Sequence, residues 1–149
     1  MTRLKHEIEF YDRFKVSDAT SEIEVWDSVI FPNVIRKREV ELILSQLEKV
    51  KPEIILDFGC GAGWLSRFLS SRGYHVTGID ASAPLIRSAV KSSRDMPEMV
   101  VGDCLSLPFR NASFDFIVGM AIFHHLDADA AFLECWRVSS PGAKLLLME

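Results

Sequence analysis

The chain has 149 residues, of which 48% are hydrophobic and 26% charged, so it can build a core and is not disordered throughout. Its net charge of −4 argues against general binding to nucleic-acid backbones. Its three cysteines form no C-x-x-C pair, so we expect neither a disulfide framework nor a metal site. We expect a cytoplasmic protein without a membrane partner, because no apolar run approaches the roughly 18 residues of a membrane span and the first residues lack a signal-peptide core.

The first 50 residues have a helical pattern, with apolar residues at 40, 43, 44 and 47 and Pro32 suited to the first helical turn. Residues 51–52 (Lys-Pro) break this helix. The apolar run 54–58, bounded by glycines, is typical of a strand buried on both faces. We therefore expect one domain over 1–149, with a helical segment at 1–50 and an α/β core at 51–149.

Strands and helices alternate along the core. A helix through residues 65–69 ends near Gly73, a strand covers 75–80, and Ser82 caps a helix running to about residue 91. The other predicted elements are a weak strand at 99–101, a strand at 114–119, a helix from Asp127 or Asp129 through Trp136, a turn at 141–142, and a strand at 143–148. This alternation predicts a Rossmann-like, doubly wound parallel sheet, which binds ligands at the carboxyl ends of its strands.

Three glycines at alternate positions, 59, 61 and 63, separate the first strand from the next helix. Such a loop lets a polar or anionic ligand lie against its backbone. The third glycine of a dinucleotide fingerprint would fall at position 64, which is Trp64, so a nicotinamide oxidoreductase is disfavoured. Asp80 ends the second strand and could accept both hydroxyls of a ribose, while Asp103 after the third strand could accept from an adenine amino group.

In this order and spacing, the motifs resemble the class I S-adenosylmethionine-dependent methyltransferases, in particular the small-molecule (type 11) branch. The resemblance covers roughly residues 40–149 and is carried by residues 55–63, 78–82, 102–109, 114–118 with 123–126, and 134–138 with 141–142. It implies five strands in the order 3-2-1-4-5 behind N-terminal helices, without the usual strands six and seven. It also implies S-adenosylmethionine as cofactor, S-adenosylhomocysteine as product, and methyl transfer by in-line displacement.

The resemblance assigns a cofactor-binding set. The glycine loop would hold the methionine part, Asp80 the ribose, and Asp103 with the Cys104 N–H the adenine. Asp57 would orient the loop and could meet the amino group, although it could equally only brace the turn. The full set is Asp57, Gly59, Cys60, Gly61, Gly63, Asp80, Ala81, Asp103, Cys104 and Met120.

On the acceptor side, His124 and His125 follow the fourth strand and are candidate catalytic bases, since an imidazole titrates near pH 6.5. The alternative is that one of them packs or caps the next helix. Tyr11, Phe123 and His125 are candidate substrate contacts. For Tyr11, which relatives would place in a lid, packing on the core is an equal alternative.

Residues 119–122 lack the Asn/Asp-Pro-Pro-aromatic signature of enzymes that methylate bases, so we expect a small-molecule acceptor and no nucleic acid. The sequence stops directly after the predicted fifth strand, whose residues 145–147 are all leucine. Either the chain is a fragment, or a partner chain or second copy covers that edge. An alternative function is therefore a non-catalytic S-adenosylmethionine-binding module that needs a partner chain.

Overall fold

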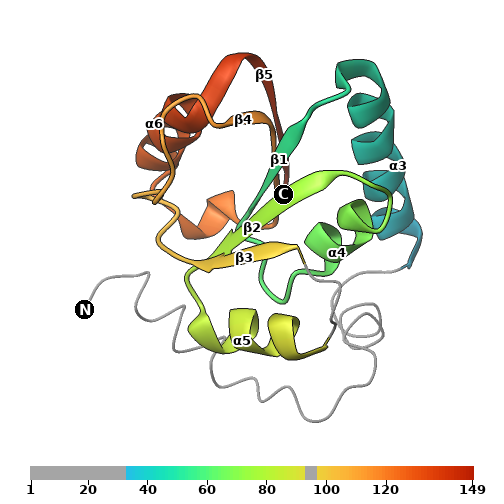
Figure 1. The fold of residues 1–149 in the computed structure, drawn as a ribbon, viewed down its shortest axis with the longest axis horizontal. Coiled ribbons are helices and arrows are strands. Elements are labelled where there is room, and N and C mark those ends of the chain that lie inside the picture. The colour runs from blue at the N-terminus through green and yellow to red at the C-terminus, as the bar shows by residue number, and fades with distance from the viewer. Residues whose placement is uncertain (1–32, 93–96) are drawn as a thin grey trace.

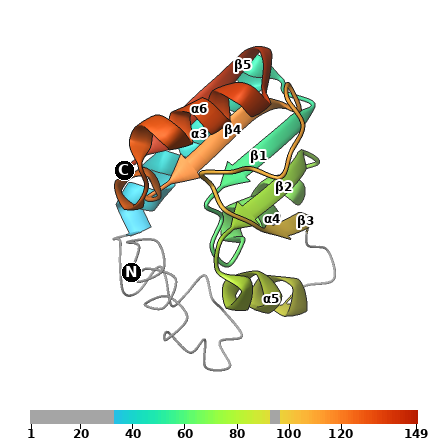
Figure 2. The same cartoon turned by 90° about the vertical axis from the view of Figure 1, so that its left-hand side faces the viewer.

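A computed structural model of the protein describes residues 33–92 and 97–149, which form a parallel sheet with helices on both faces (Figure 1). The elements are α3 (Asn33–Val50), β1 (Ile54–Phe58), α4 (Trp64–Ser70), β2 (His75–Asp80), α5 (Ala83–Ser92), β3 (Glu98–Val101), β4 (Phe114–Met120), the 3-10 helix η1 (Phe123–His125), α6 (Ala128–Val138) and β5 (Ser139–Met148). All neighbouring strands pair in parallel, in the order β3-β2-β1-β4-β5, which Figure 2 shows from the edge strand β5 to β3. The predicted fold and strand order are thus confirmed.

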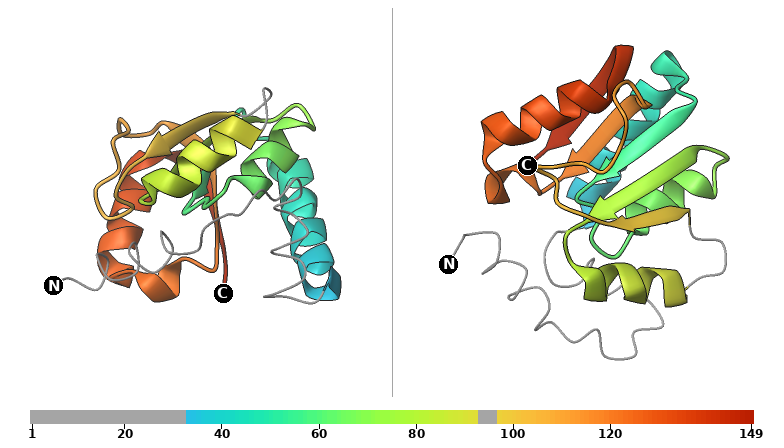
Figure 3. Two further views of the ribbon diagram at one scale, coloured as in Figure 1. Left: turned by 90° about the horizontal axis from the view of Figure 1, so that it is seen from below. Right: turned by 60° about the vertical axis from the view of Figure 1, so that its left-hand side comes forward.

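The sheet separates two apolar clusters, because its central strands bury side chains on both faces. One cluster joins α3 and α4 to the sheet through Ile43, Leu47 and Leu69, all fully buried. The other joins α6 to the opposite face through Ala131 and Cys135. The left view of Figure 3 shows α3 and α6 on opposite sides of the sheet. The carboxyl ends of the strands are thereby fixed from both faces.

Predicted helix caps lie where the sequence placed them. The Ser82 hydroxyl accepts a hydrogen bond from the Leu85 N–H at 3.4 Å and begins α5. Of the two candidates for α6, Asp127 is the cap, since its carboxylate accepts from the Ala130 N–H at 3.1 Å. Pro32, expected in the first turn of α3, lies outside the described residues.

The predicted turn at 141–142 is wrong, because β5 already begins at Ser139 and passes through these residues. The register jumps from Phe114 paired with Ser139 to Phe116 paired with Lys144, so β5 bulges there. Gly142 carries the bulge with a φ of +87°, and Pro141 is tolerated because β5 is an edge strand of the described sheet. The Ser140 hydroxyl, bonded to the Phe114 carbonyl oxygen, holds the irregular part against β4.

The β5 side of the described structure presents apolar surface. Leu145, Leu146 and Leu147 are half-buried against the two core clusters. On the neighbouring helix α6, Leu133 and Trp136 are exposed, Trp136 to 83%. Exposed apolar side chains gathered on one helix are typical of a surface that contacts something else.

Candidate functional site

The glycine loop leaves β1 at the carboxyl edge of the sheet, beside the point where the strand order reverses between β1 and β4. Gly59, Gly61 and Gly63 all have left-handed backbone conformations, with φ of +72°, +55° and +74°. The N–H groups of Gly59 and Cys60 both bond the Ile79 carbonyl oxygen at 2.9 Å, which fastens the loop to β2. A Cβ added at Gly61 would meet no atom within 4 Å, so this part of the loop backbone faces open space.

Asp80, at the end of β2, holds the neighbouring part of the loop. One of its carboxylate oxygens accepts the Gly61 N–H at 2.8 Å, and the other accepts the Ser82 N–H at 2.8 Å. The side chain is only partly buried, as is Ala81 beside it. A carboxylate therefore stands next to the open backbone of the glycine loop, where a ribose hydroxyl could be accepted.

Asp57 lies beneath the loop rather than on its open side. It is 3% exposed, and its carboxylate accepts the hydroxyl of the fully buried Ser66, from α4, at 2.5 Å. Burial raises the pKa of Asp57 to about 7, against the hydrogen bonds from Ser66, and the nearby charge of Asp80 raises it further. The hydrogen bond from Ser66 supports the alternative that Asp57 braces the turn between β1 and α4. Contact of Asp57 with a cofactor stays a prediction. The sequence offered no signal for Ser66 as its partner.

Both cysteines of the predicted set are buried. Burial raises the pKa of Cys60 and of Cys104 well above the usual thiol range, aided by nearby carboxylates such as Asp80. Thiols in this state are poor nucleophiles, so the structure favours a packing role for their side chains. A Cβ at Gly78 in β2 would lie 3.0 Å from the Cys60 sulfur, so the glycine there makes room for this packing.

The remaining two members of the set, Asp103 and Met120, lie at the ends of two other strands, β3 and β4. Asp103 follows β3 and is exposed, and its carboxylate accepts the Leu105 N–H at 2.8 Å within its own turn. Met120 is the last residue of β4 and packs against the apolar cluster under α3 and α4. The ends of β1, β2, β3 and β4 thus bring the predicted cofactor residues to one edge of the sheet.

The chain leaving β4 is fitted closely onto the glycine loop. Ala121 adopts a left-handed conformation, with φ of +51°, and its N–H bonds the Met148 carbonyl oxygen at 2.7 Å. The next side chain, Ile122, then covers Gly59, where an added Cβ would lie 2.4 Å from its Cγ1. A Cβ at Gly119 would also lie 3.1 Å from Ile122. The absence of side chains at both glycines is what admits Ile122, which sequence reasoning missed.

Glu149 binds the η1 turn that carries both histidines. Its carboxylate accepts the N–H groups of Ile122, Phe123 and His124 at 3.2, 2.8 and 3.2 Å. The same carboxylate contacts Nδ1 of His124 at 2.5 Å. Burial acts to raise the pKa of Glu149, but these hydrogen bonds outweigh it, so the pKa is lowered. The rings of His124 and His125 are in contact, with their centroids 3.8 Å apart and their planes tilted by 47°.

Of the two aromatic substrate candidates, the structure describes only Phe123. Phe123, the first residue of η1, is buried, with its ring centroid 5.6 Å from that of Phe58 and 4.9 Å from that of Phe132. Its side chain is therefore part of the core. Tyr11 lies outside the described residues. In the described part of the chain, no helix is both long and apolar enough to span a membrane, and no three or more His, Cys, Asp or Glu side chains form a group that could hold a metal.

Comparison with known proteins agrees with this geometry. A methyltransferase-domain family model (type 11) matches residues 56–147. The demethylmenaquinone methyltransferase of Thermotoga maritima is 38% identical over 117 residues, which are 76% of this chain and 49% of that protein. The chain spans about half the length of the curated relatives it matches.

Solved structures show the same fold. The PH0226 protein of Pyrococcus horikoshii is 30% identical, with a TM-score of 0.67 over 76% of this chain and 53% of that one. A phosphoethanolamine N-methyltransferase of Haemonchus contortus, solved with phosphomonomethylethanolamine and S-adenosylhomocysteine, is 28% identical, with a TM-score of 0.62 over 70% of this chain and 27% of that one. The family match, the strand order and the glycine loop agree, and the chain belongs to the type 11 branch of the class I S-adenosylmethionine-dependent methyltransferases.

Proposed function

We propose that this domain binds S-adenosylmethionine and transfers its methyl group to a small-molecule acceptor. The observation that carries the proposal is the open glycine loop whose Gly61 N–H is held by the Asp80 carboxylate at the end of the adjacent strand. The family match and a similar structure solved with S-adenosylhomocysteine support the same cofactor. When bound, S-adenosylmethionine would supply a methyl group activated by a positively charged sulfur.

Different residues of the chain would bind different parts of the cofactor. The backbone of the glycine loop would receive the polar methionine end, because the open space at Gly61 lets a ligand approach it closely. Asp80 would accept the ribose hydroxyls, and Asp103 would accept from the adenine amino group. Asp57, buried against Ser66, would keep the loop in place. Positioning of this kind can lower a barrier by about 7–11 kcal/mol without any further catalytic group.

The acceptor side consists of the η1 turn next to the loop. His124 is its candidate base for an acceptor that must lose a proton, and such a base adds about 10²–10⁴-fold to the rate. His125, whose ring contacts that of His124, would line the acceptor pocket. A base is dispensable for acceptors that are already unprotonated, so the role of these histidines depends on the acceptor.

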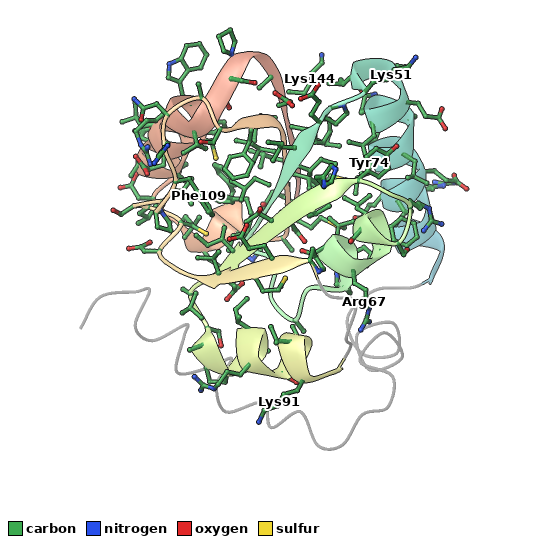
Figure 4. All side chains as sticks on the ribbon, viewed as in Figure 1. Lys51, Arg67, Tyr74, Lys91, Phe109 and Lys144 are labelled. Carbon is green, nitrogen blue, oxygen red and sulfur yellow. The ribbon has the colours of Figure 1, made fainter. Side chains whose placement is uncertain are left out.

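A small molecule is proposed as acceptor because the chain is acidic overall and residues 119–122 lack the signature of enzymes that methylate bases. Figure 4 labels four basic side chains, with Lys51 and Lys144 near the top of the view, Arg67 right of centre and Lys91 near the bottom. The net charge is −4. Binding of phosphate backbones needs basic side chains gathered on one surface. Similar proteins are named for different acceptors, among them a quinone precursor, a phosphorylated amine and tRNA, which leaves the acceptor's identity open.

Calorimetric titration of the chain with S-adenosylmethionine and, separately, S-adenosylhomocysteine tests the cofactor proposal. We expect micromolar binding of both. Replacing Asp80 with Ala should weaken binding about 10- to 100-fold, since hydrogen bonds to a charged group contribute about 1.5–3 kcal/mol. Asp129→Ala, at an exposed acidic position on α6, is the matched control and should bind normally. Absence of binding by the folded wild-type chain would contradict the proposal, and unchanged affinity of D80A would contradict the ribose assignment.

The second candidate function is a cofactor-binding module that needs a partner chain or a second copy for turnover. The observation that favours it is the apolar surface beside β5, where Trp136 and Leu133 on α6 are exposed. Transfer of a labelled methyl group from S-adenosylmethionine to pools of small acceptors distinguishes the two. Transfer by the chain alone supports the enzyme, whereas binding without transfer, restored by a longer chain or a partner, supports the module.

A further inference from the structure

The Glu149 carboxylate makes four hydrogen-bond contacts with one short segment, residues 122–124. Three are backbone N–H groups of consecutive residues beginning at Ile122, and the fourth is Nδ1 of the His124 ring at 2.5 Å. The His124 side chain is 53% exposed and that of Glu149 39% exposed. This histidine therefore has its ring held at one nitrogen by a carboxylate while much of its side chain remains at the surface.

This contact determines which imidazole nitrogen carries the proton. An ionised carboxylate has only acceptor sites, so a neutral His124 bonded to it must present Nδ1–H as donor. The lone pair of the neutral ring then resides on Nε2. The lowered pKa of Glu149 keeps its carboxylate ionised at neutral pH, so the same arrangement persists there.

The η1 turn is also fixed in relation to the glycine loop. Ile122 covers Gly59, and the ring of Phe123 packs on that of Phe58, the residue that ends β1. Glu149 itself follows β5, the strand paired with β4, so the ends of these two strands determine where the histidine stands. The turn that carries His124 therefore borders the proposed cofactor-binding loop.

We infer that Glu149 is a positioning residue that fixes the tautomer and orientation of His124, so that Nε2 is the atom that takes the proton of the methyl acceptor. The inference rests on the proposed methyl transfer. The acceptor's proton moves to Nε2, and the electron pair left on the acceptor atom forms the bond to the methyl carbon as the carbon–sulfur bond breaks. The imidazolium so formed is paired with the Glu149 carboxylate and returns its proton to water.

The first test is spectroscopic and needs no acceptor. Ring ¹⁵N shifts of the histidines are recorded above about pH 8, where an ordinary imidazole is neutral, and the His124 signals are identified by their loss in His124→Asn. We expect wild-type His124 to be mainly the Nδ1–H tautomer. Glu149→Leu should increase the Nε2–H population several-fold, whereas Glu149→Gln, which keeps an acceptor oxygen, should retain the wild-type tautomer. Glu98→Gln, on the opposite edge strand β3, is the matched control and should change nothing.

The second test separates this inference from the proposed function. With an acceptor found by screening, Glu149→Gln should lower kcat while leaving KM and the calorimetric affinity for S-adenosylhomocysteine unchanged, because the tautomer is kept and the balancing charge is lost. A wild-type His124 in the Nε2–H tautomer would overturn the inference even if Glu149→Leu failed to fold. Intact cofactor binding with an unchanged tautomer in Glu149→Leu would overturn the inference alone. Loss of cofactor binding in every variant, wild type included, would instead overturn the proposed function.

Discussion

Replacing Asp57 with Asn tests the ionisation state of the carboxylate under the glycine loop. Burial raises the pKa of Asp57 from 3.8 to about 7, although the Ser66 hydroxyl donates to it. The folded chain therefore binds this proton more tightly than the unfolded chain does. By linkage, the stability that the protonated carboxyl contributes is fully present below about pH 4 and is lost as the pH rises through about 7.

The magnitude follows from the size of the shift. A change from 3.8 to about 7 corresponds to about 4 kcal/mol of wild-type stability lost across this window, at 1.36 kcal/mol per unit. Asp57→Asn has no group to ionise there, so its stability relative to wild type should improve by about this amount as the pH rises. The amide satisfies the Ser66 donors less well, at a cost of about 1–3 kcal/mol that does not vary with pH. The pH-dependent part of the difference therefore isolates the ionisation.

The assay is urea unfolding followed by tryptophan fluorescence between about pH 4.5 and pH 7.5, comparing each variant with wild type at every pH. Other titrating groups cancel in this difference. Asp115→Asn is the control, because hydrogen bonding from Ser140 lowers the pKa of Asp115, so its difference from wild type should be flat over the same range. If the Asp57→Asn difference were equally flat, the carboxylate would not be buried and uncharged as the structure indicates, and the reasoning would be refuted.

Two further substitutions test packing at the site and at its border. Gly59→Ala should lower the free energy of unfolding by about 2–5 kcal/mol, because alanine is strained in a left-handed conformation and its Cβ clashes with Ile122. Adding Ile122→Ala to this variant should remove the clash but not the backbone strain, and urea unfolding measures how much stability returns. Trp136→Glu should change stability by less than about 0.5 kcal/mol, because the side chain is 83% exposed, yet shift sedimentation towards the monomer if the β5 side pairs with a second copy. An unaltered sedimentation profile would count against pairing through this surface.

The parts of the fold that the sequence predicts are those with strong local signals. Residues 54–58 and 114–119 are apolar runs bounded by breakers, and the structure buries most of these side chains because helices cover both faces of the sheet. The predicted start of β5 was wrong because a contact between residues far apart in the sequence determines where this strand begins. Ser140 bonds Asp115, 25 positions away, and that contact keeps a Pro-Gly pair inside an edge strand, where the local pattern indicates a turn.

The same distinction applies to the candidate site. The glycine loop and Asp80 are recognisable because loop geometry and strand ends follow from short-range sequence. Ile122 and Glu149 could not be found in this way. Ile122 matters only because Gly59, in the loop after β1, and Gly119, in β4, leave room for it. Glu149 matters because β5 ends beside the exit of β4. Both depend on strand pairing and strand length, which the sequence pattern does not fix to the residue.

Two carboxylates hold the two halves of the site, and their surroundings act in opposite directions. Asp57, buried against a single partner residue, has a raised pKa, whereas Glu149, partly exposed and bonded by several N–H groups, has a lowered one. Between about pH 5 and pH 6 the Glu149 carboxylate is therefore charged while Asp57 is largely protonated. Because the Ile122 side chain packs directly against Gly59, a displacement of the η1 turn should also move the glycine loop. The end of β5 thus supports both the proposed base and the proposed cofactor loop.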